Sequence, residues 1–310
     1  MLKRNPFLTP PPSGEKPRPF REVVDDVIES LPQDLPTDPQ QLLIGLDIDG
    51  TLLTPTGATP RVRSLYRAVI EAGIHTVIAS GRTLGAVRPI VSQLGTDTGV
   101  SVCSNGAVIA QWDPHCEGGV RVVQTCEFRV DEVWDRVLSV LPDAIIGVEK
   151  DGGFFISDFF PEGELIEEHW VLPIEQLRQK KTPNLVVRAP QMSIEQFSAA
   201  LDDSQVRQTH EVFVGWTSWA NIGPLGCTKA RALDDLARQY GVPPQGTIAV
   251  GDGSNDVPML EWAALGVAMG GADSQVRSHA QHVTAAVEND GAAAVMAALL
   301  WHCGVPFPSA

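Results

Sequence analysis

Short apolar runs alternate with amphipathic stretches in two separate parts of the chain. Apolar residues that recur every three or four positions predict helices, whereas short continuous apolar runs predict buried strands. The first part predicts strands at 42–46, 76–79 and 101–103 with helices at 61–72 and 84–94, and the second predicts helices at 229–240 and 258–264 with a strand at 247–250. Strands and helices that alternate in this way form a mostly parallel sheet covered on both faces. We therefore predict a doubly wound α/β core made of residues 41–111 and 223–310.

The segment between these parts, residues 112–222, is richer in valine and aromatic residues. Its pattern predicts strands at 120–126, 144–148, 154–156, 185–188 and 212–216, with helices at 130–141 and 194–201. We interpret it as an inserted α+β domain with an open sheet. Candidates to stack on a sugar face or a flat ring, or else to pack in the core of the insert, are Phe154, Phe155, Trp216 and Trp219. Candidates for polar substrate contacts, or for a solvated hairpin tip, are Glu149, Lys150 and Asp151.

Residues 1–40 are rich in proline and predict an extended arm that buries little surface. Within the arm, apolar residues fall at helical spacing at Phe20, Val23, Val24, Val27, Ile28 and Leu31. This spacing predicts a short amphipathic helix that packs on its own domain. A docking site for a partner is the alternative interpretation.

The apolar run at 42–46 ends abruptly in two carboxylates, Asp47 and Asp49, followed by Gly50 and Thr51. Carboxylates at positions i and i+2 of a strand point to the same side. Two like charges at the end of a buried strand are costly unless a metal ion or a proton compensates them. A surface turn with two solvated acids is the alternative.

A second acidic segment strengthens the metal interpretation. The apolar run at 247–250 leads into Gly251 and Asp252, and Asn255 and Asp256 follow closely. Ser80 and Asn105 also follow predicted strands. Ligands of open α/β sheets bind beyond the carboxyl ends of the strands, so we expect these four loops to converge. Carboxylate and amide oxygens are hard ligands that suit Mg²⁺.

The composition excludes some classes of function. The 310 residues are 43% hydrophobic and carry a formal net charge of -15, which argues against a nucleic-acid partner. An anionic substrate therefore needs a local positive field, for which Mg²⁺, Lys229, Arg82 and backbone N–H groups are the candidates. The apolar runs are too short to span a membrane, and no apolar segment follows Lys3 and Arg4 as in a secretory signal. Five cysteines without a Cys-x-x-Cys pair fit reduced thiols, so we expect a cytoplasmic protein that is monomeric or homodimeric.

Taken in order, these segments resemble the haloacid dehalogenase superfamily of phosphatases, and most closely its Cof-type, sugar-phosphatase-like subfamily IIB. The resemblance covers roughly residues 42 to 300. It is carried by Asp47–Leu52, by Ser80 in Ala-Ser-Gly-Arg, by Asn105-Gly106, by Lys229, and by Gly251–Asp256. The chain departs from the subfamily at Ala230 and Gly271, where Gly and Asn are common. Neither position carries a reacting group.

The resemblance implies a Rossmann-like core with a C2-type cap inserted at 112–222, and Mg²⁺-dependent hydrolysis of a small phosphorylated metabolite, with sugar phosphates first. It implies that Asp47 is the nucleophile that becomes an aspartyl phosphate and that Asp49 is the general acid and base. Mg²⁺ would be bound by Asp47, the Asp49 backbone carbonyl and Asp252, with Asp256 in the metal set. Ser80 and Lys229 would stabilise the phosphoryl group. Further substrate or phosphate contacts are expected from Gly50, Arg82, Asn105, Gly106 and Asn255.

Three alternatives remain open at this point. A phosphomutase of the phosphomannomutase type uses the same pair of aspartates. A dehalogenase needs neither an acid at Asp49 nor a Mg²⁺ site around Asp252. A non-catalytic sensor of phosphorylated metabolites need not retain Asp49.

Overall fold

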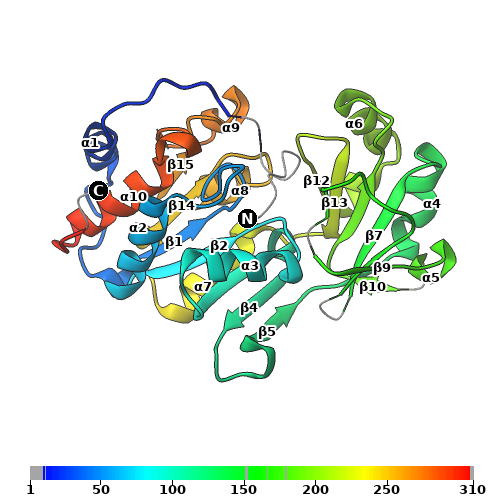
Figure 1. The fold of residues 1–310 in the computed structure, drawn as a ribbon, viewed down its shortest axis with the longest axis horizontal. Helices are drawn as coiled ribbons and strands as arrows, with labels where there is room; N and C mark the ends of the chain where they lie inside the picture. The colour runs from blue at the N-terminus through cyan, green and yellow to red at the C-terminus, as the bar shows by residue number, and fades with distance from the viewer. Residues whose placement is uncertain (1–9, 11, 151–152, 166, 179, 308–310) are drawn as a thin grey trace.

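The computed structural model describes residues 10, 12–150, 153–165, 167–178 and 180–307. Asp151, a candidate substrate contact, lies outside these residues, as does the start of the proline-rich arm. Among the described residues, two separate sheets lie side by side, each with its own helices (Figure 1). The larger sheet contains the strands that lead to the predicted catalytic residues.

The larger sheet has eight strands in the order β16-β15-β14-β1-β2-β3-β4-β5. It is parallel from β16 to β3, and β4 and β5 pair antiparallel at one edge. This confirms a mostly parallel α/β core. Its strands are β1 (Leu43–Leu46), β2 (His75–Ala79), β3 (Gly99–Cys103), β4 (Val108–Trp112), β5 (Val120–Thr125), β14 (Thr247–Gly251), β15 (Leu265–Ala268) and β16 (His282–Val283).

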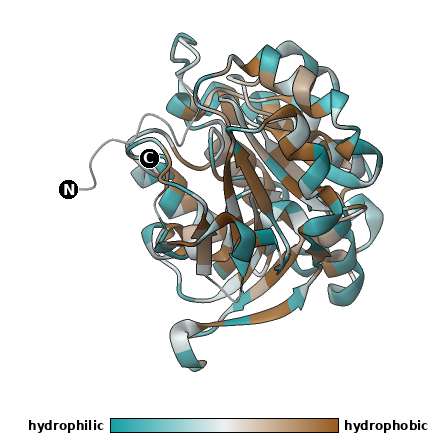
Figure 2. Cartoon of the chain, turned by 90° about the vertical axis from the view of Figure 1, so that its right-hand side faces the viewer, coloured by the Kyte–Doolittle hydropathy of each residue, from teal (hydrophilic) through white to brown (hydrophobic). Residues whose placement is uncertain are grey.

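Helices cover both faces of this sheet. Side chains alternate along β1, so Ile44 and Leu46 pack on one face and Leu43 packs on the other. Figure 2 shows hydrophobic strands between helices that are hydrophilic on their outer sides. One face is covered by α1 (Phe20–Ser30), α2 (Pro60–Glu71), α3 (Leu84–Leu94) and α10 (Gly291–His302), and the other by α7 (Lys229–Tyr240), α8 (Val257–Trp262) and α9 (Ser274–Ser278).

The smaller sheet has six strands in the order β12-β13-β11-β7-β8-β9, and only β8 and β9 are parallel. The strands are β7 (Ile145–Lys150), β8 (Gly153–Ile156), β9 (His169–Val171), β11 (Leu185–Arg188), β12 (His210–Val214) and β13 (Trp219–Pro224). A two-stranded ribbon, β6 (Phe128–Arg129) with β10 (Lys181–Thr182), accompanies it. Apolar side chains from α4 (Asp131–Val140), α5 (Ile174–Arg178) and α6 (Ile194–Asp203) pack on one face of this sheet. We call this sheet and its helices the cap.

Two local expectations were wrong. The sequence predicts a strand at 120–126 in the insert, but the strand found there, β5, pairs with β4 and belongs to the core sheet. The valine-rich composition of this strand is typical of the insert, but its antiparallel pairing with β4 keeps it in the core sheet. Glu149 was expected on a loop, but it is a buried residue of β7 that receives hydrogen bonds from the Ser104 hydroxyl and the Leu84 backbone N–H. A long-range contact between cap and core therefore buries the Glu149 carboxyl, whereas the polar residues beside it in the sequence predict that it is exposed to water.

The expected amphipathic helix is α1, whose Val23, Val24 and Val27 are buried against the core sheet's helices. Before it, the arm is anchored by Glu15, whose side chain accepts hydrogen bonds from the Ala286 backbone N–H at 2.7 Å and from Asn289 Nδ2 at 2.9 Å. The helix thus packs on its own domain, as the apolar stripe predicted.

Candidate active site

Asp47 stands directly after β1, and its backbone N–H continues the sheet by donating to the Val250 carbonyl at 3.0 Å. The chain then turns sharply at Gly50, which has φ of +81°. A Cβ on Gly50 would lie 2.2 Å from Asp252 Oδ2, so only glycine allows the two acidic loops to come this close. Thr51 Oγ1 joins the loops by donating to Asp252 Oδ1 at 3.1 Å.

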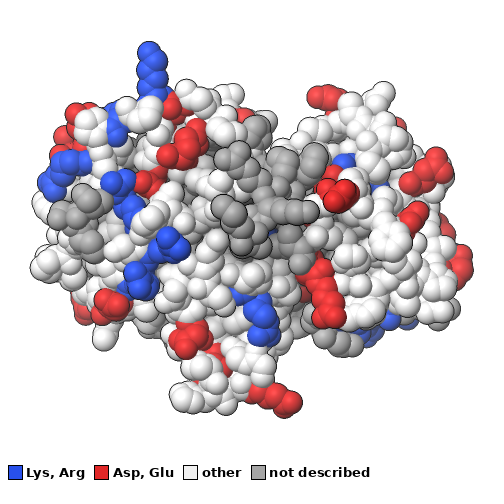
Figure 3. Space-filling view, viewed as in Figure 1, with Lys and Arg blue, Asp and Glu red and all other residues white. Residues whose placement is uncertain are grey.

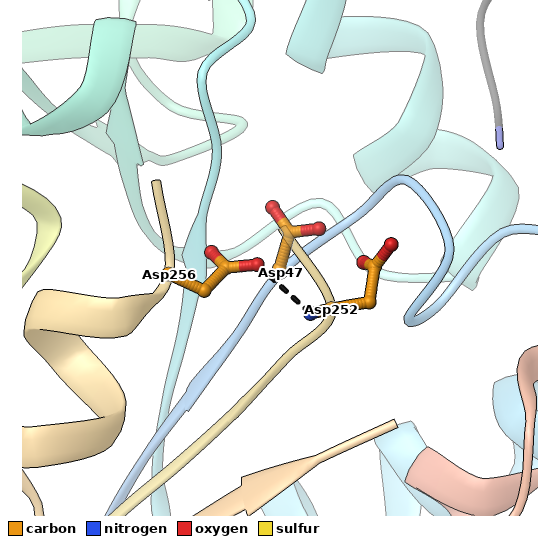
Figure 4. Close-up of side chains that lie close together, drawn as sticks. All are labelled: Asp47, Asp252 and Asp256. Atoms are coloured by element: carbon orange, nitrogen blue, oxygen red, sulfur yellow. Dashed lines mark hydrogen bonds between the residues drawn. The ribbon is translucent and has the colours of Figure 1, made fainter. Parts of the chain in front are cut away.

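The second acidic loop is organised by Asp256, which is fully buried at the start of α8. Its Oδ2 atom accepts hydrogen bonds from the backbone N–H groups of Asp252 and Gly253, both at 2.9 Å. Figure 4 draws the bond from Asp252. The Oδ1 atom of Asp256 accepts from Lys229 Nζ at 2.6 Å. Asp256 therefore holds the Asp252 loop in shape with one oxygen and binds Lys229 with the other.

Lys229 is the first residue of α7, and its side chain is completely buried. The helix packs closely on β1, because Leu233 Cδ1 lies 2.7 Å from where a Cβ of Gly45 would be. This places Lys229 Nζ 2.6 Å from Asp47 Oδ1 as well as from Asp256. Burial by itself would lower the pKa of Lys229, but the charges of Asp256 and Asp47 raise it above its ordinary value. Lys229 is therefore a fixed positive charge beside Asp47.

Three carboxylates from two loops meet at this point. Oxygen atoms of Asp47, Asp252 and Asp256 all lie within 4.8 Å of one another (Figure 4). Burial and the neighbouring carboxylate of Asp256 raise the pKa of Asp47 to about 7, and burial with the charge of Asp47 raises that of Asp252 well above its usual range. When ionised, three carboxylates against one ammonium leave two negative charges. Hard oxygen ligands with this surplus fit a divalent cation such as Mg²⁺.

Asp49 points to a different partner. Its carboxylate forms a two-point ion pair with Arg82, with Nε to Oδ2 at 2.7 Å and a second guanidinium nitrogen to Oδ1 at 2.6 Å. The Asp49 side chain is therefore outside the carboxylate cluster. The metal contact predicted for this residue uses its backbone carbonyl and stays a prediction. Arg82, expected on the substrate, is instead occupied by Asp49 in this structure.

Ser80 and Asn105 lie on the loops after β2 and β3. Ser80 is buried, and its Oγ accepts a hydrogen bond from the Arg82 N–H at 3.1 Å. Asn105 donates its N–H to the Ser80 carbonyl at 3.0 Å, and its side-chain oxygen accepts from Asn255 Nδ2 at 2.9 Å. Gly106 packs against the start of α7, because a Cβ there would lie 2.2 Å from the Thr228 carbonyl. The contacts of Asn105 and Gly106 join these loops to one another.

A cavity of about 420 Å³ lies above these loops, between the core and the open face of the cap sheet. From the core it is lined by Asp47, Asp49, Ser80, Arg82, Asp252 and Asn255, and from the arm by Pro10. Alternation along β11 and β13 turns Asn184, Val186, Trp219 and Asn221 toward it. Of the four aromatic candidates, Phe154, Trp216 and Trp219 line the cavity, whereas Phe155 packs on Trp170 with ring centroids 5.6 Å apart.

Sequence reasoning missed several lining residues. Pro10, Glu164, Glu167, Asn184 and Asn221 belong to no motif. The two asparagines had one available signal, since Asn221 lies within β13 between Ala220 and Ile222 and Asn184 stands directly before β11. The other three reach the cavity through long-range packing, which no local pattern encodes.

The family model for haloacid dehalogenase-like hydrolases matches residues 44–137 and 143–296. The chain belongs to this family, and it is a phosphatase, as the resemblance predicted. One relative is the pyridoxal phosphate phosphatase YbhA of Escherichia coli (strain K12), 30% identical over 258 residues that cover 78% of this chain and 92% of the relative. Another is the 5-amino-6-(5-phospho-D-ribitylamino)uracil phosphatase YcsE of Bacillus subtilis (strain 168), 26% identical over 261 residues that cover 81% and 92%.

Solved structures show the same fold. A haloacid dehalogenase-like hydrolase from B. subtilis superposes with a TM-score of 0.71 at 22% identity, covering 82% of this chain and 98% of that one. The subclass IIB sugar phosphatase BT4131 superposes with a TM-score of 0.67 at 21% identity, covering 86% and 100%. Among the described residues, no helix is long and apolar enough to cross a membrane.

Proposed function

We propose that this protein is a Mg²⁺-dependent phosphatase of small phosphorylated metabolites that works through an aspartyl phosphate on Asp47. The observation that carries the proposal is the buried cluster of Asp47, Asp252 and Asp256 around Lys229, at the floor of a cavity large enough for a metabolite. Sugar phosphates are the first candidate substrates. Pyridoxal phosphate is the next, because a relative is named for that activity. The five free cysteines fit a cytoplasmic location.

In the proposed reaction, the Asp47 carboxylate attacks phosphorus in line and the ester oxygen departs. Asp49 gives a proton to the departing oxygen, then takes one from the water that hydrolyses the aspartyl phosphate. Ser80 Oγ and Lys229 Nζ bind phosphoryl oxygens whose charge grows in the transition state. Asp47, Asp252 and the Asp49 backbone carbonyl would hold Mg²⁺, which would supply the positive charge that screens the repulsion between Asp47 and the phosphate. Asp256 orients that set through the Asp252 N–H and Lys229.

Arg82 gives this scheme a further requirement. A carboxylate held at both oxygens by a guanidinium is a poor proton donor, so Asp49 must be released before it can act as an acid. An incoming phosphate competes for the same guanidinium, because Arg binds phosphate and carboxylate with the same fork of donors. We therefore propose that substrate binding draws Arg82 from Asp49 to the phosphate.

The test is phosphate release from a panel of phosphorylated metabolites, with and without Mg²⁺, for the wild type and for Asp47→Asn. We expect release that needs Mg²⁺ and falls by roughly 10⁴-fold or more in Asp47→Asn, as when other enzymes lose their nucleophile. The exposed acid Asp25, changed in Asp25→Asn, provides the control for the substitution itself. Hydrolysis by a pure sample of Asp47→Asn at a rate near that of the wild type would contradict the assignment.

A further inference from the structure

The cap side of the cavity has an unusual balance of charge. Its lining combines aromatic rings and amides with two acids, in Phe154, Phe213, Trp216, Trp219, Asn184, Asn221, Glu164 and Glu167. Among the described residues that line the whole cavity, Arg82 is the only Lys or Arg, and it belongs to the core floor and pairs with Asp49. The part of a substrate that extends toward the cap therefore meets no Lys or Arg among the described residues that line the cap side.

The guanidinium of the cap that contacts the cavity-lining Glu164 already has its hydrogen-bond partners. Arg188 is buried and donates to both oxygens of Glu164, at 2.7 and 2.8 Å. It also donates to the hydroxyl and the carbonyl of Ser218, at 2.6 and 3.1 Å. An anion that recruited Arg188 would leave the buried Glu164 without its counter-charge, which is strongly unfavourable. Arg188 thus supports the cavity wall and is not available to bind a substrate anion.

Glu167 adds a negative charge at the junction of cap and core. Its Oε1 atom accepts a hydrogen bond from Thr83 Oγ1 at 3.0 Å, which holds the carboxylate at the edge of the cavity next to the Arg82 loop. A second anionic group on a substrate would approach this charge inside a partly closed space. Like charges in such a space repel more strongly than in open water.

The amides offer a different kind of contact. Asn184 Nδ2 donates to Asn221 Oδ1 at 3.1 Å, which orients both side chains on the cap face. The other amide atoms, Asn184 Oδ1 and Asn221 Nδ2, can bind one hydroxyl as a donor and another as an acceptor. The aromatic rings beside them suit the apolar face of a sugar or a flat ring.

From this arrangement we propose that the cap selects substrates by the charge of the part that is not the phosphate. The substrates are monophosphates whose remaining part has no net negative charge, and compounds with a further carboxylate or phosphate are excluded. The inference rests on the proposed function, because it assigns the leaving-group side of that same cavity. It makes Glu167 a specificity-determining residue.

A matched pair of substrates isolates the effect of a second negative charge on the substrate. Sorbitol 6-phosphate and 6-phosphogluconate share an open six-carbon chain and a terminal phosphate, and they differ only in a hydroxymethyl group against a carboxylate. We expect kcat/KM to favour sorbitol 6-phosphate on the order of 30-fold, which corresponds to about 2 kcal/mol. The comparison is made at constant ionic strength, because salt screens this repulsion.

Two variants separate the charge of Glu167 from the charge of the surrounding segment. Glu167→Gln keeps the acceptor for Thr83 but removes the charge, and it should reduce the preference roughly three- to tenfold. Glu168→Gln is the control, because it removes an equal charge from the neighbouring residue, which is exposed and does not line the cavity. Glu168→Gln should change the preference by less than about twofold, since water and salt screen an exposed charge.

Binding to Asp47→Asn, measured by calorimetry in Mg²⁺, separates this inference from the proposed function. If this variant binds sorbitol 6-phosphate more tightly than 6-phosphogluconate, the charge selection holds even when no compound is hydrolysed, and only the proposed function fails. Equal affinity or equal kcat/KM for the two compounds overturns the inference. So does a Glu167→Gln variant whose preference matches that of Glu168→Gln.

Discussion

The core floor and the cap wall of the cavity each contain a buried cation, but the two differ in charge balance. On the floor, Lys229 faces two of the three clustered carboxylates, so negative charge is left over. In the wall, Arg188 forms an ion pair with Glu164 and donates two further bonds to Ser218. A surplus of buried charge is costly unless a ligand compensates it, whereas a matched pair is complete by itself. This difference supports our proposal that the floor binds a metal ion and a phosphate, whereas the wall holds the shape of the cavity.

Among the changes that test this comparison of floor and wall, the largest expected effect comes from removing the cation of the floor. Lys229→Met should lower kcat on the order of 10²- to 10³-fold, as the loss of one preorganised donor does in other active sites. It should also strengthen Mg²⁺ binding, because the cluster loses the positive charge that is hydrogen-bonded to two of its carboxylates. The check is phosphate release, together with the rise in melting temperature that Mg²⁺ produces. A variant in which Mg²⁺ stabilises the protein less than in the wild type would contradict a metal site at this cluster.

Removing the cation of the wall should affect stability more than chemistry. Arg188→Met leaves Glu164 buried and unpaired, which typically costs about 3–5 kcal/mol of unfolding free energy. Adding Glu164→Leu removes the unpaired charge and should recover most of that loss. Urea unfolding of the single and double variants measures both effects. If both are equally unstable, the wall does not depend on charge balance.

The smallest expected effect concerns Glu149, where the cap contacts the core. Burial raises the pKa of Glu149 to about 7 from an ordinary value of 4.5. A raised pKa favours the protonated form in the folded state, so its stabilisation is complete below about pH 4.5 and is lost as the pH rises to about 7. Between pH 5 and pH 8 the wild type should therefore lose about 2 to 3 kcal/mol that Glu149→Gln does not lose.

Urea unfolding at pH 5, 6, 7 and 8 tests this expectation. A change in the unfolding free energy that is the same at every pH reflects the substitution itself. Only the change of the unfolding free energy with pH reports the titration of Glu149. The control variant Glu168→Gln, which removes an exposed carboxyl elsewhere in the cap, should follow the wild type at every pH. Parallel pH profiles of the wild type and Glu149→Gln would show that Glu149 does not titrate in this range.

Much of the site could be predicted because its residues follow strands of one parallel sheet. Asp47, Ser80, Asn105 and Asp252 each come after an apolar run, and parallel topology alone brings such ends to one edge. The close approach of the acidic loops was also encoded locally, since Gly50 stands where another residue would clash with Asp252.

The partners of these side chains were decided only by the tertiary structure. Asp49 pairs with Arg82, Arg188 with Glu164, and the carboxyl of Glu149 with Ser104 and the start of α3. These partners are separated by 24 to 65 positions in the sequence. Periodicity reports which face of an element is buried, but the choice of partner depends on how helices and strands pack. For this protein, the order of strands and acids determined where the chemistry lies, and the packing of cap on core determined which charges remain free to carry it out.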